Sequence, residues 1–237
     1  MSRALGARLE KTDWADVAAR LDEAGWATIG PLLSARECDA LIESYDDDAL
    51  FRKEVDMAKH GFGSGVYRYF TYPLPSIVAK LRTALYPQLA NIANCWESAL
   101  GRTPRFPAAH GDWLAACAAA GQTRPTPLLF RYDAGDYNRL HQDLYGDRVF
   151  PLQVTVLLSR PGTDFDGGEF VLTEQRPRMQ SRATVVPLEQ AGAVVFPVRE
   201  RPARGVRGVH RVAVRHGVSP IRSGRRHTLG LIFHDAR

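Results

Sequence analysis

The sequence predicts an α+β fold in which helices pack against a double-stranded β-helix, also called a jelly roll. Residues 1–125 contain stretches with helical periodicity and helix-capping residues. Residues 126–237 contain short apolar runs separated by turns that contain glycine. Short strands at this spacing are typical of β-sandwiches and barrels rather than of alternating strand and helix units. We therefore expect one domain over residues 1–237, with a mainly helical part over 1–125 and a jelly-roll core over 126–237.

Capping residues mark the first two expected helices. Asp13 can cap a helix over 14–24, which Gly25 can end in a left-handed conformation. Ser34 and Glu37 form a capping box that opens a second helix, because each side chain can bind the other residue's backbone N–H.

A longer helical tract extends over 75–100. We expect Pro87 to kink or split it, because proline lacks the N–H that an interior helical residue donates. Another helix is expected over 108–120, and two short stretches, 26–29 and 66–72, have strand character.

Six short apolar runs predict the strands of the core. Turn residues bound each run, and the longest of the runs is too short for an ordinary helix. The expected strands cover 128–132, 152–158, 168–172, 193–196, 211–214 and 228–233.

The composition is that of a globular protein without membrane spans. Of the 237 residues, 45% are hydrophobic and 24% are charged, so one large domain can bury a core. No apolar run reaches the roughly 18 residues that a membrane span needs, and the N-terminus lacks the apolar segment of a secretory signal. Cys38, Cys95 and Cys117 are far apart and form no metal-binding pair, so we expect reduced thiols, each a small buried core residue, in a cytoplasmic protein. The sequence does not indicate an oligomeric state.

Positive charge is concentrated in the last third of the chain. The net charge is +5, but residues 176–226 contain twelve arginines and only two acidic residues, Glu189 and Glu200, so the rest of the chain sums to −5. This distribution favours a polyanionic partner, with DNA or another nucleic acid first, and an arginine-rich solvated sheet face is an equally good interpretation. The arginines are Arg176, Arg178, Arg182, Arg199, Arg201, Arg204, Arg207, Arg211, Arg215, Arg222, Arg225 and Arg226.

His141 and Asp143 form a candidate metal-binding motif. In extended chain, residues two apart point to the same side, so an imidazole and a carboxylate can hold one cation. Two histidines and one carboxylate on one face of an octahedral Fe(II) leave three positions for a bidentate co-substrate and O2. The motif alone is weak, and the alternative is that His141 caps a turn while Asp143 binds backbone.

A third ligand is expected from a later strand, and both His210 and His216 lie in the right region. His216 is favoured because Arg226 follows it by ten residues, with a Pro and a Ser-Gly turn between them. We expect a hairpin that returns Arg226 to the metal, where its guanidinium can pair with the distal carboxylate of a dicarboxylate co-substrate. Thr228, on the same strand face, can add a hydroxyl. His210 is expected to be a polar strand residue near the site.

These residues resemble those of a known family. The pattern is similar to that of the double-stranded β-helix 2-oxoglutarate/Fe(II) dioxygenases, including the prolyl-hydroxylase and AlkB-type branches, and it consists of His141-x-Asp143, His216-x-Val218 and Gly224-x-Arg226. Longer segments resemble a group of bacterial oxygenases proposed to oxidatively demethylate damaged DNA bases, and they cover 131–146, 167–181, 215–219 and 226–230. The resemblance extends from about Met57 to Ala236.

The resemblance implies a single catalytic domain that uses Fe(II), 2-oxoglutarate and O2. The iron ligands would be His141, Asp143 and His216, with Arg226 anchoring 2-oxoglutarate. Leu157 departs from the pattern, because some hydroxylases have a co-substrate-binding tyrosine there, so the second contact to the distal carboxylate stays open.

Further residues are candidates for binding. Tyr132 is expected near the co-substrate, and four polar residues beside the motif or in later turns are expected near the substrate. Aromatic rings there would suit stacking on a flipped base, and strand packing is the alternative for the tyrosines. For Glu169, a surface salt bridge is the safer interpretation. Arg176 and Arg178, in a polar loop, would form a rim that contacts phosphates, or a lid. The substrate candidates are Tyr137, Asn138, Tyr145, Glu169, Arg176 and Arg178.

Three functions therefore follow from the sequence. The first is hydroxylation or oxidative demethylation by an Fe(II)/2-oxoglutarate dioxygenase, acting on alkylated DNA bases. The second is the same chemistry on an amino acid, a protein side chain or a small metabolite. The third is a non-enzymatic jelly-roll binding module in which His141 and Asp143 are structural.

Overall fold

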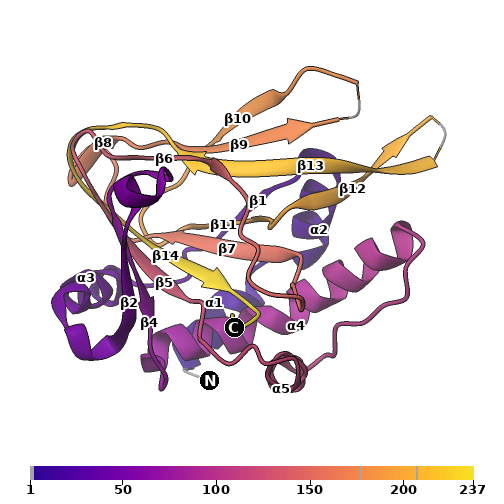
Figure 1. Ribbon diagram of the computed structural model, residues 1–237, viewed down its shortest axis with the longest axis horizontal. Helices are drawn as coiled ribbons and strands as arrows, with labels where there is room; N and C mark the ends of the chain where they lie inside the picture. Colours follow the sequence, from indigo (N-terminus) through magenta and orange to yellow (C-terminus); the bar gives the residue numbers. More distant parts are fainter. Residues whose placement is uncertain (1–2, 177, 207) are drawn as a thin grey trace.

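Two antiparallel β-sheets lie over one another, and helices cover the outer face of one of them (Figure 1). The computed structural model describes residues 3–176, 178–206 and 208–237. Within these residues the strands form an eight-stranded and a six-stranded sheet, here the larger and the smaller sheet.

The larger sheet contains strands from both halves of the chain. Its order is β1 (Ala27–Ile29), β11 (Ala193–Pro197), β7 (Leu152–Leu157), β14 (Ile221–Ile232), β5 (Leu128–Asp133), β4 (Val66–Phe70) and β2 (Phe51–Asp56), with β8 (Phe165–Gly167) paired to β14.

The smaller sheet carries two hairpins that reach past the helices at the upper right of Figure 1. Its order is β10 (Arg182–Val186), β9 (Phe170–Gln175), β13 (Gly208–Val218), β6 (Tyr137–His141) and β3 (Gly63–Ser64), with β12 (Glu200–Gly205) paired to β13. The hairpins are β9–β10 and β12–β13.

The helices pack on the larger sheet through alternate strand residues. Leu229 and Leu231 of β14 belong to the same buried cluster as Leu81 and Leu85 of a helix, so the odd-numbered residues of β14 face the helices. The even-numbered residues therefore face the smaller sheet. The helices are α1 (Arg3–Glu10), α2 (Trp14–Ala24), α3 (Ala35–Glu43), α4 (Ser76–Ala99) and α5 (His110–Ala119), with short 3-10 turns η1 (Ser44–Asp46), η2 (Asp48–Leu50) and η3 (Met57–His60).

Apolar side chains from both sheets fill the space between them. Tyr132 and Leu157 of the larger sheet pack with Val218 of the smaller one. Phe196 of the larger sheet packs with Phe170 and other residues of the smaller sheet in a second cluster. The polar residues of the site line this same space.

The helix predictions are largely confirmed. Asp13 accepts hydrogen bonds from two backbone N–H groups of α2, Gly25 ends α2 with φ +80°, and the capping box of Ser34 and Glu37 is present. Pro87, however, does not break α4, which runs from Ser76 to Ala99. The buried face of α4 packs on the sheet and compensates for the missing hydrogen bond.

The predicted hairpin between His216 and Arg226 is wrong. The chain crosses at Ser219 and Pro220 from β13 in the smaller sheet to β14 in the larger sheet. The expected turn at 222–224 lies inside β14, where Gly224 has φ +75° and β14 bulges against β8. The strand expected over 168–172 begins only at Phe170, because Gly167 and Gly168 both have positive φ.

Several elements escaped prediction, notably α1, β2, β3, β6, β10 and β12. In the part of the chain that the structure covers, none of the helices has the length and apolarity needed to span a membrane. Cys38 and Cys117 are buried as expected, whereas Cys95 is exposed.

Candidate metal and co-substrate site

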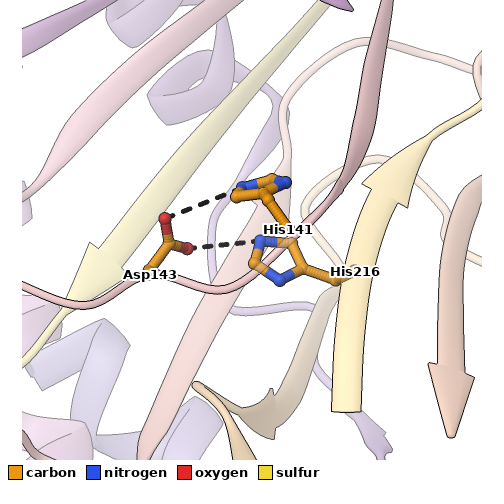
Figure 2. A group of neighbouring side chains, drawn as sticks. All are labelled: His141, Asp143 and His216. Carbon is orange, nitrogen blue, oxygen red and sulfur yellow. Dashed lines mark ion pairs between the residues drawn. The ribbon is translucent and has the colours of Figure 1, made fainter. Parts of the chain in front are cut away.

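Three predicted ligands lie together at the mouth between the sheets (Figure 2). His141 ends β6 and lies directly opposite His216 of β13, with ring centres 4.2 Å apart. Asp143 follows in the next loop and faces both rings. Its Oδ1 is 3.6 Å from Nε2 of His141, and its Oδ2 is 3.3 Å from Nε2 of His216. One ligand atom from each residue lies within 4.8 Å of the others, which is a spacing that one metal ion can bridge.

The imidazoles are oriented by their surroundings. His141 donates from Nδ1 to the backbone oxygen of Arg139 at 2.7 Å, because that carbonyl can only accept, and this leaves the Nε2 lone pair facing Asp143. The His216 ring packs on Phe196 at 4.7 Å and on Phe170 at 6.0 Å. These contacts present one Nε2 atom from each histidine to the carboxylate.

The site favours a neutral His216 imidazole beside a charged Asp143 carboxylate. Burial lowers the pKa of His216, reinforced by His141 and opposed by Asp143. Burial raises the pKa of Asp143, but His216, His141 and Tyr145 outweigh it and hold that pKa well below its usual range. Neutral histidine and ionised aspartate are the forms that bind a metal, so the residues fit an Fe(II) ion.

Arg226 supplies a second feature that requires a ligand. Its side chain is only 1% exposed, and within the described residues its Nε and Nη1 atoms have no hydrogen-bond partner. The guanidinium carbon lies 5.7 Å from the ring centre of Tyr132 and 5.8 Å from that of Phe165. Burial lowers the pKa of Arg226 to about 10. A buried cation without a partner is costly, so this arginine is suited to receive a carboxylate.

The surroundings of Arg226 include the other predicted co-substrate residues. Tyr132 of β5 is paired with Arg226 in the strand register, and Thr228, 2% exposed, follows on the same face of β14. Leu157 lies opposite Thr228 on β7 and leaves no hydroxyl where some hydroxylases have a tyrosine. Arg226 and Leu157 line a pocket of about 250 Å³.

A separate pocket of about 190 Å³ opens beside His141 and Asp143. Its wall is mostly aromatic and apolar, and three of the eleven lining residues come from the N-terminal part of the chain. Asn138 connects this pocket to the arginine side, because it donates to the Tyr132 hydroxyl at 3.3 Å. The lining residues are Met57, Phe62, Tyr67, Leu128, Phe130, Asn138, His141, Gln142, Asp143, Leu144 and Tyr145.

The predicted substrate residues divide into those at this pocket and those away from it. Asn138 and Tyr145 line it, and Tyr145 donates to Oδ1 of Asp143 at 3.0 Å. Tyr137 is half-buried and, by strand alternation, on the opposite face of β6 from Asn138. Glu169 forms an ion pair with Arg222 at 3.0 Å and accepts from Ser219, so the salt-bridge interpretation describes it.

The remaining candidates, Arg176 and Arg178, lie in the β9–β10 hairpin, beyond the strand residues that flank His216. Arg176 lines a groove of about 790 Å³ against α2 and α4 rather than the pocket at the triad. His210 lies on β13 opposite Ala203 of β12 and is not part of the cluster with Asp143.

Sequence reasoning missed the aromatic wall of the pocket. Tyr67 was expected in a strand, but its place at the site depends on β4 pairing with β5, and nothing local indicates that pairing. The alternation of Tyr67 and Tyr69 was the one available signal. Phe196, which packs on His216, comes from a strand of the opposite sheet.

Comparison with known families and sequences identifies the family of the chain. Residues 65–236 match the family Oxygenase-NA, described as "Oxygenase, catalysing oxidative methylation of damaged DNA". Two Mycobacterium tuberculosis proteins, MT2286 of strain CDC 1551 and Rv2227 of strain H37Rv, are each 54% identical over 167 residues, which is 70% of this chain and 72% of theirs. Both are described as uncharacterized.

Solved structures show a similar fold at low sequence identity. A 2OG-Fe(II) oxygenase family oxidoreductase from Burkholderia pseudomallei is 18% identical with a TM-score of 0.55, over 95% of this chain and 94% of that one. A prolyl-4-hydroxylase from Pseudomonas putida is 17% identical with a TM-score of 0.52, over 94% and 99%. The family resemblance stated from the sequence is thereby confirmed. The chain belongs to the Oxygenase-NA family and is an oxygenase with the fold of the 2-oxoglutarate/Fe(II) oxygenases.

Proposed function

We propose that this oxygenase is an Fe(II)- and 2-oxoglutarate-dependent dioxygenase that hydroxylates or oxidatively demethylates alkylated bases in DNA. The observation that carries the reaction class is the presence of two features in the same domain. His141, Asp143 and His216 form a two-histidine, one-carboxylate set, and Arg226 lies buried without a partner among the described residues. We also infer that the two sheets form the expected jelly roll.

Each residue has a defined task in this proposal. His141, Asp143 and His216 would hold Fe(II), while Arg226, with Thr228 and Tyr132 beside it, would receive the distal carboxylate of 2-oxoglutarate. The bound iron, with 2-oxoglutarate and O2, supplies the oxidising chemistry. The apolar walls of the pocket beside His141 exclude water and orient the substrate. Hydroxylation of an N-methyl group gives a hemiaminal, which releases formaldehyde.

The shape of the pocket supports a flat substrate of limited size. Its volume of about 190 Å³ and its aromatic lining suit one planar ring better than an extended chain. Tyr67 and Phe130 lie tilted to each other on its wall, with ring centres 5.1 Å apart. Aromatic side chains bind a displaced base by stacking, and the name of the matched family points to the same substrate class.

Only some of the arginines in the arginine-rich region, residues 176–226, are accessible to a nucleic-acid partner. Arg201 and Arg226 are buried, and Arg201 is held by Glu174. Arg178 and Arg204 are exposed on the two hairpins, outside the ion pairs of the described residues. Arg207 lies outside the described residues. The exposed arginines of the hairpins therefore remain the candidates for contact with phosphates.

The test begins with an anaerobic titration of the metal-free protein with Fe(II) and 2-oxoglutarate. The titration is monitored by the visible charge-transfer absorption band. We expect the band in the wild type, its loss in His216→Ala, and its retention in His210→Ala, a matched histidine on the same strand. Turnover is then screened on methylated single-stranded oligonucleotides, on amino acids and on peptides, with succinate and formaldehyde as readouts. Absence of the band in the wild type would refute the reaction class. Turnover of an amino acid or peptide, without turnover of any oligonucleotide, would show that the substrate is not an alkylated DNA base.

A further inference from the structure

The two oxygens of the Asp143 carboxylate have different surroundings. Oδ1 accepts a hydrogen bond from the Tyr145 hydroxyl at 3.0 Å. Oδ2 faces Nε2 of His216 at 3.3 Å. Oδ1 also lies 3.6 Å from Nε2 of His141, so each oxygen faces one histidine, but Oδ1 is in addition bound by a phenol.

This difference matters because a carboxylate can bind a metal through one oxygen or through both. An octahedral ion held by three protein atoms keeps three open positions, which a bidentate co-substrate and O2 fill. If Asp143 chelated through both oxygens, a fourth position would be taken. Only two positions would then remain for three incoming atoms.

We propose that Tyr145 is a positioning residue that keeps Asp143 a one-oxygen ligand, because its hydrogen bond occupies Oδ1 and leaves Oδ2 as the oxygen for the metal. The inference rests on the proposed function, because it concerns how the same site keeps room for 2-oxoglutarate and O2. Tyr145 acts through Asp143, so it is not itself a catalytic residue.

A second tyrosine fixes the direction of the Tyr145 hydroxyl. Tyr69 of β4 donates to the Tyr145 oxygen at 3.0 Å, and the Tyr69 side chain is 6% exposed. A phenol that accepts from one neighbour has one proton left to donate, and here Asp143 is the acceptor. The chain of hydroxyls from Tyr69 to Tyr145 to Asp143 is therefore directional.

The loop that carries Tyr145 is held by other bonds. The Gln122 amide donates to the backbone oxygens of Tyr145 at 3.1 Å and of Arg148 at 3.0 Å, and its Oε1 accepts from the Arg148 N–H at 2.7 Å. None of these bonds uses the Tyr145 hydroxyl. Replacing Tyr145 by Phe therefore removes the hydrogen bond to Asp143 while leaving the support of the loop in place.

The experiment compares Tyr145→Phe and Tyr69→Phe with Tyr86→Phe. Tyr86 is the matched control, since its hydroxyl is buried without a hydrogen-bond partner in the described part of the chain. Three quantities are measured: Fe(II) affinity by anaerobic titration, 2-oxoglutarate affinity of the iron-loaded protein from its charge-transfer band, and the unfolding temperature of the metal-free protein.

We expect Tyr145→Phe to weaken 2-oxoglutarate binding to the iron-loaded protein by about tenfold or more and to shift the band, which is the scale of effect that removing a partner of a metal ligand has. Tyr69→Phe should change the 2-oxoglutarate affinity and the band position in the same direction but by less. Tyr86→Phe should change neither the affinity nor the band. A wild-type band and affinity in both Tyr145→Phe and Tyr69→Phe would overturn this inference alone. A wild type without the band would overturn the proposed function together with this inference.

Discussion

Arg226 lies directly opposite Tyr132 on the neighbouring strand, with its guanidinium carbon 5.7 Å from the centre of the tyrosine ring. The ring covers one side of the cation but offers it no carboxylate. A flat aromatic platform beneath a buried arginine leaves the planar edge of the guanidinium, with its N–H donors, available to an incoming anion.

Substituting Arg226→Gln should weaken 2-oxoglutarate binding by at least about 30-fold, because removing one partner from a buried charge pair costs roughly 2–5 kcal/mol. The metal-free protein should not lose stability, since an uncompensated buried charge disappears. Arg225→Gln is the matched control, because Arg225 is exposed and paired with Asp133. Calorimetric titration with 2-oxoglutarate and thermal unfolding measure both effects. Equal affinities in the two variants would contradict the role of Arg226.

Gly168→Ala should impair the 2-oxoglutarate site at Arg226 by steric overlap. A Cβ at Gly168 would lie 2.3 Å from Cδ1 of Ile221 and 2.9 Å from Cδ of Arg226, in a backbone with φ +61°. Gly101→Ala is the control, because its φ of +71° imposes similar strain and its Cβ would meet nothing within 4 Å. We expect Gly168→Ala to cost about 1–3 kcal/mol of stability beyond the control and to lower 2-oxoglutarate affinity. Indistinguishable unfolding midpoints and affinities would show that Arg226 has room to move.

Phe62→Ala should affect the substrate and spare the co-substrate. Phe62 lines the pocket beside His141, is 47% exposed, and has the His60 ring stacked on it at 5.3 Å. Removing one stacking ring costs about 1–3 kcal/mol per base, so the KM for a methylated oligonucleotide should rise about 5- to 150-fold. The KM for 2-oxoglutarate should stay constant. Val185→Ala, at an exposed site on β10, is the control, and a KM for the oligonucleotide that is unchanged in Phe62→Ala would exclude stacking at this mouth.

Neutralising hairpin arginines should reduce the salt dependence of nucleic-acid binding. Removing one arginine that binds a phosphate lowers the slope of the logarithm of affinity against the logarithm of salt concentration by about 0.7 for a single strand. Arg178→Gln and Arg204→Gln should each lower that slope, whereas Arg20→Gln should not, because Arg20 lies on α2 paired with Asp16. Fluorescence anisotropy at several salt concentrations gives the slopes. Equal slopes in all three variants would show that nucleic acid does not bind at the hairpin arginines Arg178 and Arg204.

Stability should fall on acidification because of buried histidines. Burial and Arg82 lower the pKa of His110 to about 3, against about 6.5 in an unfolded chain. The unfolded state therefore binds the proton first as pH falls, so stability that is complete above pH 6.5 is lost as pH decreases toward about 3. His110→Gln should lessen the loss between pH 7.5 and 5.5 by about 1.4 kcal/mol, measured by urea unfolding. An identical loss in the wild type and the variant would contradict this assignment.

The cluster of His141, Asp143 and His216 was predictable because these residues combine a local motif with a characteristic spacing. His141 and Asp143 are two residues apart at a strand end, and His216 could be chosen over His210 by the position of Arg226. The predicted hairpin between His216 and Arg226 was wrong, however. Whether two strands pair in one sheet or face each other across two sheets depends on long-range packing. A run of residues between two strands does not specify that choice.

The pocket beside His141 and Asp143 could not be predicted for a related reason. Tyr67 and Phe62 lie more than 70 residues before Asp143 in the sequence, and they reach it only through the pairing of β4 with β5 and of β3 with β6. Helix caps such as Asp13 depend on neighbours a few residues away, so they were identified. Strands that complete a sheet from a distant segment, such as β1 and β4, could be expected as strands but not placed.

The crossing at Ser219 and Pro220 puts His216 and Arg226 in different sheets. On the proposed function, 2-oxoglutarate would therefore span the interior, with one end at the histidine side and the other at the arginine side. It would link two layers that the chain also connects between β13 and β14. Saturation with the co-substrate at about 100 times its dissociation constant would add roughly 2.7 kcal/mol to the stability of the closed pair of sheets. The melting temperature of the iron-loaded protein would then rise with the concentration of 2-oxoglutarate.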